Sequence, residues 1–164
     1  MIVRDTTPAE LPAAGALRVA AYLAGGFLYK DDPYVETLRG LGSGGNGVVL
    51  VAEDAGRLLG TVMLAELDAS SELARHPGEA DIRALAVAPD AQGRGVGRLL
   101  LRSMIDRAAE RGVRRLLLST LPAMRAAHHL YESEGFSRVP GLDWEPASGV
   151  RLLGYERRLG PGDG

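Results

Sequence analysis

The apolar and polar residues of this chain alternate in two ways, and the two patterns predict both strands and helices. Residues 48–53 and 58–67 are apolar runs rich in β-branched side chains, joined by the turn Asp54-Ala55-Gly56, which predicts a β-hairpin. Between residues 95 and 111, apolar side chains recur every three or four positions, which predicts an amphipathic helix. Its apolar positions are Leu100, Leu101, Met104 and Ala108.

The same patterns predict further elements on both sides of these. A helix is expected to begin after Thr7, because Thr7 and Glu10 have the spacing of a capping box and Pro8 suits the first turn. The polar segment 68–78 is expected to be a loop. We further predict strands at 2–5, 80–88, 116–118 and 150–159, strand material at Phe136, and helices at 34–41 and 123–134.

Composition narrows the class of protein. The chain has 164 residues, of which 46% are apolar and 24% charged, a balance typical of a globular protein with its own core. The net charge of −2 argues against a protein that coats nucleic acid or an anionic membrane. There is no apolar run of about 20 residues and no signal-peptide core, so we expect a cytoplasmic protein. We predict one domain over residues 1–160, with a frayed tail at 161–164.

The most informative segment leads from a predicted strand into the helix at 95–111. Its sequence is Gln92-Gly93-Arg94-Gly95-Val96-Gly97-Arg98. Glycines at alternate positions remove side chains from the loop, so its N–H groups can converge where the helix N-terminus adds about half a positive charge. A pyrophosphate fits this arrangement, and Arg94 and Arg98 can add charge-assisted hydrogen bonds. No Gly-Lys-Ser/Thr follows the loop, so it is not a Walker loop.

Together with two further segments, this loop resembles the GNAT family of acetyl-CoA-dependent N-acetyltransferases, including its single-domain bacterial members. The segments are Asp81-Ile82-Arg83-Ala84-Leu85-Ala86-Val87-Ala88-Pro89 and Ala127-x-x-Leu130-Tyr131-x-x-x-Gly135-Phe136, and the likeness covers roughly residues 48–136 in order and spacing. The resemblance implies an α+β (mixed α/β) fold. Its central sheet would be curved, mostly antiparallel and splayed in the middle, with six to seven strands and about four flanking helices. It also implies an enzyme that transfers an acetyl group directly from acetyl-CoA to a primary amine in a ternary complex.

The resemblance also assigns the cofactor contacts. The diphosphate of CoA is expected on the N–H groups of the loop, and the pantetheine arm is expected to bind the preceding main chain like an added strand. Strand addition needs an exposed edge, which the family creates by splaying two strands, here Ala84–Val87 and Leu116–Ser119. Thr120 is expected where the family often has an asparagine at the pantetheine end. The predicted cofactor-binding residues are Leu85, Ala86, Val87, Gln92, Gly93, Arg94, Gly95, Val96, Gly97, Arg98 and Thr120.

Acyl transfer from a thioester to an amine requires a base for the amine and an acid for the leaving thiolate. An alkylammonium loses its proton near pH ~10.4, and a thiol near ~8.5, so a phenol near ~10 can serve as the acid. The resemblance assigns this role to Tyr131. Asp81 occupies a strand position where some family members carry a glutamate, and Glu79 lies two residues earlier on the same face. The base is therefore Asp81, Glu79 or an ordered water.

The acceptor is expected to contact the least patterned part of the chain. Phe27, Tyr29 and Tyr34 lie among carboxylates, and aromatic walls with carboxylates suit an amine with an apolar body, although the same rings can simply cover the core. The partner is thus a small-molecule or peptide amine, and a homodimer is a family expectation. No histidine or carboxylate pattern has metal-ligand spacing, and there is no cysteine, so we predict no metal.

Two other functions remain open from the sequence. The first is a non-catalytic domain that binds acyl-CoA and has a regulatory role on the same scaffold. The second is a nucleotide-binding module that uses the glycine-rich loop for ATP or NAD. The first alternative predicts affinity for the cofactor without transfer, and the second predicts a different preference among nucleotides.

Overall fold

The computed structural model describes residues 1–45 and 47–160. They form four α-helices and eight strands, in a mixed α/β arrangement. The chain separates into two compact units, which are described in turn. The first unit consists of Met1–Leu64 and Ala84–Met104, and the second consists of Ala65–Arg83 and the described residues from Ile105 onward. The predicted frayed tail at 161–164 lies outside the described residues.

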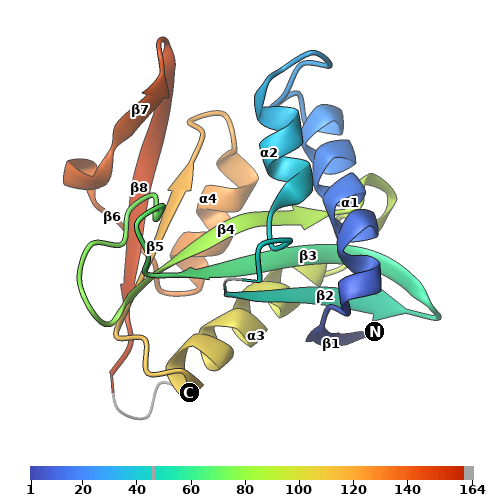
Figure 1. The fold of residues 1–164 in the computed structure, drawn as a ribbon, viewed down its shortest axis with the longest axis horizontal. Coiled ribbons are helices and arrows are strands. Elements are labelled where there is room, and N and C mark those ends of the chain that lie inside the picture. Colours follow the sequence, from blue (N-terminus) through green and yellow to red (C-terminus); the bar gives the residue numbers. More distant parts are fainter. Residues whose placement is uncertain (46, 161–164) are drawn as a thin grey trace. The chain divides into compact units, whose positions relative to one another are not determined.

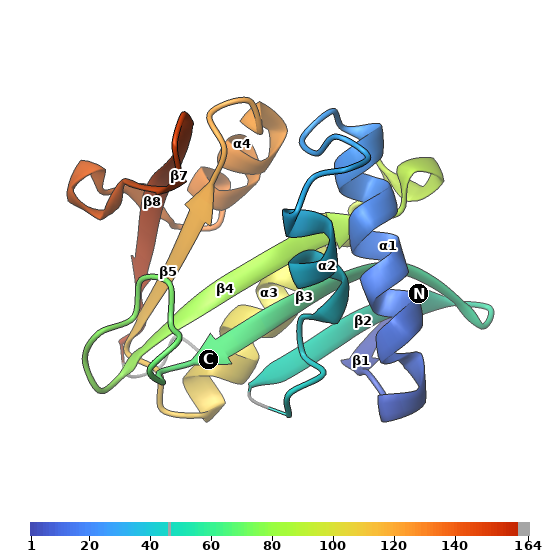
Figure 2. The same cartoon turned by 45° about the horizontal axis from the view of Figure 1, so that its top comes forward.

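The first unit contains an antiparallel sheet in the order β1-β2-β3. Figure 2 shows α1 and α2 side by side over strands β2 and β3. A Cβ atom on Gly15 would lie 2.1 Å from the carbonyl oxygen of Arg39, so the close approach of the two helices requires glycine there. The elements are β1 (Ile2–Asp5), α1 (Leu11–Ala24), α2 (Tyr34–Gly40), β2 (Val48–Asp54), most of β3 (Arg57–Glu66), the end of β4 (Glu79–Val87) and the start of α3 (Val96–Glu110).

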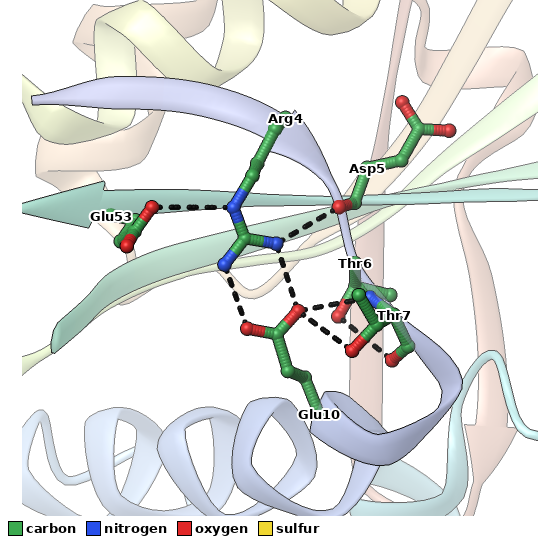
Figure 3. A network of polar contacts seen from close by, with 6 residues as sticks. All are labelled: Arg4, Asp5, Thr6, Thr7, Glu10 and Glu53. Atoms are coloured by element: carbon green, nitrogen blue, oxygen red, sulfur yellow. Dashed lines mark hydrogen bonds and ion pairs between the residues drawn. The ribbon is translucent and has the colours of Figure 1, made fainter. Parts of the chain in front are cut away.

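The predicted start of the first helix is confirmed, although a 3₁₀ turn at Pro8–Glu10 precedes α1. The N–H group of Thr7 donates to Glu10 Oε1 over 2.9 Å, as a capping box requires. The Arg4 guanidinium then donates to both oxygens of Glu10, over 2.8 and 2.7 Å, and to Glu53 over 3.3 Å (Figure 3). These contacts join β1, β2 and the turn before α1. The hydrogen bonds from Arg4, followed by that from the Thr7 main chain, lower the pKa of Glu10 to about 2.

The second unit contains strands in the order β4-β5-β8-β6, with β7 paired to β8. β4 and β5 are parallel from the pair Glu79–Arg115 to the pair Ile82–Leu118, and the other strand pairs of this unit are antiparallel. In Figure 1, β7 and β8 form a long hairpin beside β5. The elements not yet given are β5 (Arg115–Thr120), α4 (Arg125–Ser133), β6 (Ser137–Arg138), β7 (Trp144–Ala147) and β8 (Val150–Arg158).

Asp143 anchors the chain just before this hairpin. Its carboxylate accepts hydrogen bonds from both terminal nitrogens of Arg138 at 2.7 Å, from Arg151 at 2.8 Å and from the N–H group of Gly154 at 2.8 Å. These contacts lower the pKa of Asp143 to about 2, with the Arg138 hydrogen bonds as the largest cause. Trp144 begins β7 and donates its indole N–H to Ser119 Oγ over 3.0 Å.

The mixed α/β fold, the four helices and the mainly antiparallel strands are confirmed. The structure has eight strands where six to seven were expected, and the strand that was not predicted is β7. Its sequence is Trp-Glu-Pro-Ala, which has no apolar alternation and is mostly exposed. Within the described residues, no helix combines the length and the apolar character that crossing a membrane demands.

Candidate functional site

The glycine-rich loop of the first unit joins β4 to α3 through a short 3₁₀ turn at Pro89–Ala91. Gly93 has φ +80° and Gly95 has φ +79°, and a Cβ at either position would meet nothing within 4 Å. Glycine is thus needed here for its backbone conformation, since L-residues pay about 1–2 kcal/mol in the left-handed region. Gln92–Gly95 are exposed, whereas Val96 is buried and fixes the first turn of α3.

The N–H groups of this loop are available to a ligand. Among the described residues, those of residues 93–97 form no hydrogen bond, and the first ladder bond of α3 runs from Leu99 N–H to the carbonyl oxygen of Gly95. The first N–H groups of a helix have no partner inside the helix, and together they attract anions. Nearby, Arg94 is 3.4 Å from Asp54, and Arg57 pairs with Asp90. Arg94 is half-exposed and can turn from Asp54 to an anion in the loop.

The segment of β4 that precedes the loop offers main-chain groups to an added strand. Ala88 N–H donates to the carbonyl oxygen of Leu59 over 2.8 Å, and a Cβ on Gly60 would lie 2.8 Å from the carbonyl oxygen of Ala86. Ala86 and Ala88 therefore face β3, and the main-chain groups of Leu85 and Val87 point to the opposite edge, because successive residues of a strand alternate. The parallel register with β5 ends earlier, at Ile82. Ala84 has φ +52°, which interrupts the regular strand between these two segments.

In the second unit, the ring of Tyr131 is packed on the inner side of α4. Its centroid lies 5.9 Å from that of Phe136 and 6.1 Å from that of Tyr155, and the residue is 7% exposed. Burial raises the pKa of Tyr131 to about 12. Within the described residues the Tyr131 hydroxyl forms no hydrogen bond. It is also not one of the fully buried polar atoms that have no partner, so it is partly accessible to solvent. The phenol of Tyr131 is thus protonated at neutral pH, and its hydroxyl is not engaged in another hydrogen bond.

Asp81, one of the two predicted bases, is 1% exposed and holds the loop that precedes β4. Its Oδ2 accepts the N–H groups of Glu72 and Leu73 over 3.0 and 3.3 Å, and its Oδ1 accepts that of Ala74 over 3.0 Å. Burial raises the pKa of Asp81 more than these hydrogen bonds and Arg83 lower it. Both oxygens are committed to the main chain, which favours a structural contact over proton transfer with a substrate.

Glu79, the other predicted base, has similar commitments. Its Oε1 accepts the N–H groups of Arg75 and His76 over 2.9 and 3.0 Å, and its Oε2 is 2.8 Å from Arg115. Burial raises the pKa of Glu79, but the hydrogen bonds from Arg75, Arg115 and His76 outweigh burial, so the pKa is lowered. A carboxylate with a lowered pKa is a weaker base at neutral pH.

The remaining predicted contacts are divided between the two units. Thr120 is 2% exposed in β5, and its hydroxyl lies 3.6 Å from the sulfur of Met124. Phe27 packs edge-to-face on Tyr22, with centroids 6.4 Å apart. Tyr29 and Tyr34 are 63% and 39% exposed, so these two rings are not needed to cover the core and are accessible to an acceptor.

Sequence reasoning missed Glu72 and its ion pair with Arg83, in which Arg83 Nη2 is 3.1 Å from Glu72 Oε2. Glu72 lies in the segment predicted only as a polar loop, and no local pattern marks it. Its position depends on hydrogen bonds to Asp81, nine residues away. In the described residues, no group of three or more His, Cys, Asp or Glu side chains has the geometry of a metal site.

An open, amide-lined loop at a helix N-terminus, entered from a strand with an unused edge, defines a class of proteins that bind a phosphorylated cofactor. Residues 17–136 match the model of the acetyltransferase (GNAT) family, and the chain belongs to this family.

Several proteins similar to this chain are named as acetyltransferases. Mycothiol acetyltransferase of Cellulomonas flavigena is 37% identical over 113 residues, which are 63% of this chain and 32% of that protein, so the chain spans about a third of its length. The structure of a GCN5-related N-acetyltransferase from Kribbella flavida is 29% identical, with a TM-score of 0.71 and coverage of 96% of this chain and 97% of the other. The fold is also that of a putative acetyltransferase from Salmonella typhimurium solved with acetyl-CoA, at 20% identity, 98% and 94% coverage and a TM-score of 0.69.

Proposed function

We propose that the chain transfers the acetyl group of acetyl-CoA to a primary amine of a small molecule or peptide, directly and without a covalent enzyme intermediate. The observation that carries this proposal is the unfilled set of N–H groups at residues 93–97, which suits the diphosphate of CoA. The edge of β4 at Leu85 and Val87 supports strand-like binding of the pantetheine arm. The family match extends through parts of both units, which supports the prediction of one acetyltransferase domain over residues 1–160.

Tyr131 is proposed as the general acid. Its raised pKa keeps the phenol protonated at neutral pH, and its hydroxyl is uncommitted, so it can donate to the departing thiolate. The thiol has a pKa of ~8.5, below that of the phenol, so the phenolate must regain a proton. The attacking nitrogen becomes an ammonium as it bonds to the acetyl carbon, and this ammonium supplies that proton through solvent.

The proton that the amine loses before attack needs a different acceptor. Asp81, Glu79 and an ordered water were the predicted candidates. The three main-chain contacts of Asp81 and the lowered pKa of Glu79 favour structural roles for these two carboxylates. Water or another carboxylate is thereby favoured as the acceptor of this proton.

For the acceptor site we retain Phe27, Tyr29 and Tyr34, of which the two tyrosines are exposed. Exposed aromatic rings beside Asp31 and Asp32 suit an amine with an apolar body. Because the Cellulomonas relative is named mycothiol acetyltransferase, an acceptor related to mycothiol belongs in the assay panel.

Calorimetry with CoA, ATP and NAD, followed by an assay of thiol release from acetyl-CoA with a panel of amines, tests the proposal. We expect CoA to bind more tightly than ATP and NAD, and at least one amine to accelerate thiol release. Binding of CoA without transfer to any amine would favour the non-catalytic acyl-CoA-binding alternative. Preference for ATP or NAD would favour a nucleotide-binding module.

The role of Tyr131 predicts the effect of a single substitution. Tyr131→Phe removes only the hydroxyl, so we expect kcat to fall by ~10²–10⁴-fold with CoA affinity retained. Tyr155→Phe is the matched control, because its ring is also buried and packs on Tyr131. Steady-state kinetics of the two variants give the comparison, and equal kcat values for Tyr131→Phe and the wild type would exclude the acid role.

A further inference from the structure

A histidine that the proposed reaction does not use, His128, lies on α4 three residues before Tyr131. Residues three apart on a helix share a face, so the imidazole and the phenol project from the same side of α4. His128 is half-buried, whereas the adjacent His129 is exposed. The two histidines thus differ in environment although they are neighbours in sequence, and His129 is a matched reference for His128.

The imidazole of His128 links the start of α4 to the end of β5. Its Nε2 lies 3.0 Å from the carbonyl oxygen of Leu121, and because a carbonyl oxygen only accepts, Nε2 carries the hydrogen. The same oxygen accepts the N–H group of Met124 over 3.0 Å. Met124 is the N-cap of α4 and, in the structure as described, gives the helix no side-chain cap. The His128 hydrogen bond therefore ties the first turns of α4 to the residue that follows β5.

The same imidazole packs on Tyr155, whose place is fixed by the sheet. The two ring centroids are 5.7 Å apart, with the ring planes inclined by 34°. Tyr155 is 4% exposed in β8, where it pairs with Leu118 of β5 and with Arg138 of β6. The guanidinium carbon of Arg138 lies 5.8 Å from the centroid of the Tyr155 ring, within the range of a cation–π contact. Contact with this ring thus positions α4 relative to the sheet.

Tyr131 packs on the same Tyr155 ring, with centroids 6.1 Å apart, and on Phe136, at 5.9 Å. Since the Tyr131 hydroxyl forms no hydrogen bond within the described residues, ring packing and the placement of α4 decide where it lies. A shift of about 1 Å in a reacting group can cost about 10²-fold in rate, so this placement matters for catalysis. All of these residues belong to the second unit.

We propose that His128 is a positioning residue that holds the Tyr131 hydroxyl in the place that acetyl transfer requires. This inference rests on the proposed acid role of Tyr131, and His128 acts on the reaction only through that phenol. Its two contacts have separate tasks. The hydrogen bond to Leu121 holds the start of α4, and the contact with Tyr155 holds the inner face of the helix against β8.

A double-mutant cycle in kcat tests the coupling between His128 and Tyr131. His128→Leu removes both the hydrogen bond and the aromatic ring. With lysine amide, spermidine and n-butylamine as acceptors, we expect it to lower kcat about 10-fold and to leave CoA affinity by calorimetry unchanged. In the Tyr131→Phe background no phenol hydroxyl is left to position, so the same substitution is expected to change kcat by less than about twofold.

His129→Leu is the matched control for this cycle, because it replaces the same residue type at an exposed position of the same helix. It is expected to leave kcat unchanged with and without the Tyr131 hydroxyl. A loss of kcat in His129→Leu equal to that in His128→Leu would overturn the inference, since any leucine on α4 would then have the same effect.

His128→Gln and His128→Phe separate the two contacts. Glutamine keeps an N–H donor for the carbonyl oxygen of Leu121 but lacks the ring, and phenylalanine keeps the ring but lacks the donor. Each is expected to lower kcat about threefold, and each effect is expected to vanish in the Tyr131→Phe background. Because each variant retains one contact, they also test the inference if His128→Leu does not fold.

Two further results of the cycle would overturn the inference while leaving the proposed acetyl transfer intact. One is an equal fold-loss in kcat with and without the Tyr131 hydroxyl, because the histidine would then act independently of the phenol. The other is a wild-type kcat in all three His128 variants. The acid role itself fails if Tyr131→Phe keeps the wild-type kcat, and the proposed function fails if the wild type binds CoA but transfers to no amine. In either of these cases the inference falls with it.

Discussion

The loop before β4 and the loop after it differ in whether their main-chain N–H groups have hydrogen-bond acceptors. Before the strand, the N–H groups of residues 72–76 are filled by the carboxylates of Asp81 and Glu79, which belong to the strand itself. After the strand, those of residues 93–97 have no partner among the described residues. Carboxylates of the chain itself thus complete the first loop, whereas the second is the loop proposed for the diphosphate of CoA.

This difference indicates what each loop is for. A loop closed by its own carboxylates gains order from hydrogen bonds to charged groups, each contributing about 1.5–3 kcal/mol, and needs no ligand. A loop with unfilled N–H groups lacks that stabilisation, and its left-handed glycines leave its surface open. We therefore expect a bound anion to stabilise it. The filled loop is thus suited to hold a side chain such as Glu72, and the open loop is suited to hold a phosphate.

Removing the internal anion is expected to have the largest effect. Asp81→Ala leaves three N–H groups without an acceptor, one of them, that of Ala74, fully buried. We expect the free energy of unfolding to fall by about 3–5 kcal/mol, since each unsatisfied buried donor costs about 1–3 kcal/mol. Urea denaturation measures this change. Asp31→Ala, in an exposed loop, is the control, and a loss below about 1 kcal/mol for Asp81→Ala would show that its carboxylate does not organise the loop.

Adding an internal anion to the open loop is the converse experiment. Gly95→Asp places a carboxylate beside the N–H groups of residues 93–97, where it competes with the diphosphate of CoA. We expect CoA affinity to fall by ~100-fold, about 2.7 kcal/mol, as measured by calorimetry. Aspartate tolerates the left-handed region better than most residues, so folding is expected to be retained.

Gly149→Asp controls for backbone strain in this experiment. Gly149 also has φ +79° and also has nothing within 4 Å of an added Cβ, but it lies in the turn between β7 and β8. The two variants are therefore expected to lose similar stability, while only Gly95→Asp loses affinity for CoA. Equal CoA binding by Gly95→Asp and Gly149→Asp would refute the assignment of the diphosphate to this loop.

The sequence was informative where function depends on local backbone geometry. The glycines of the loop, the helix that follows it and the capping box at Thr7 and Glu10 are all short-range patterns, and the structure has each of them. Gly135 likewise ends α4 with φ +89°, as its position after the helix predicted.

What the sequence did not show depends on contacts between distant residues. The commitment of Asp81 to the main chain of residues 72–74 is invisible in a pattern that marks Asp81 only as polar. The raised pKa of Glu72 results from tertiary burial, and no spacing records it. β7 was missed because its residues lack alternation and its pairing with β8 is a tertiary contact.

Acidification is expected to weaken the filled loop by a smaller amount, through Glu79. Its pKa is lowered in the folded chain, so its stabilising contribution is fully present above the ordinary value of 4.5 and is lost as the pH falls through the lowered folded value. We expect the difference in unfolding free energy between the wild type and Glu79→Gln to be about 1 kcal/mol at pH 6 and to shrink toward pH 3. Taking the difference cancels the titration of Glu10 and Asp143, whose pKa values are also lowered.

Amide exchange at Arg75 and His76 is expected to follow the same pH dependence, while exchange at residues 93–97 is not, because no internal carboxylate bonds to them. A difference that stays constant between pH 6 and pH 3 would mean that the charge of Glu79 does not close the loop.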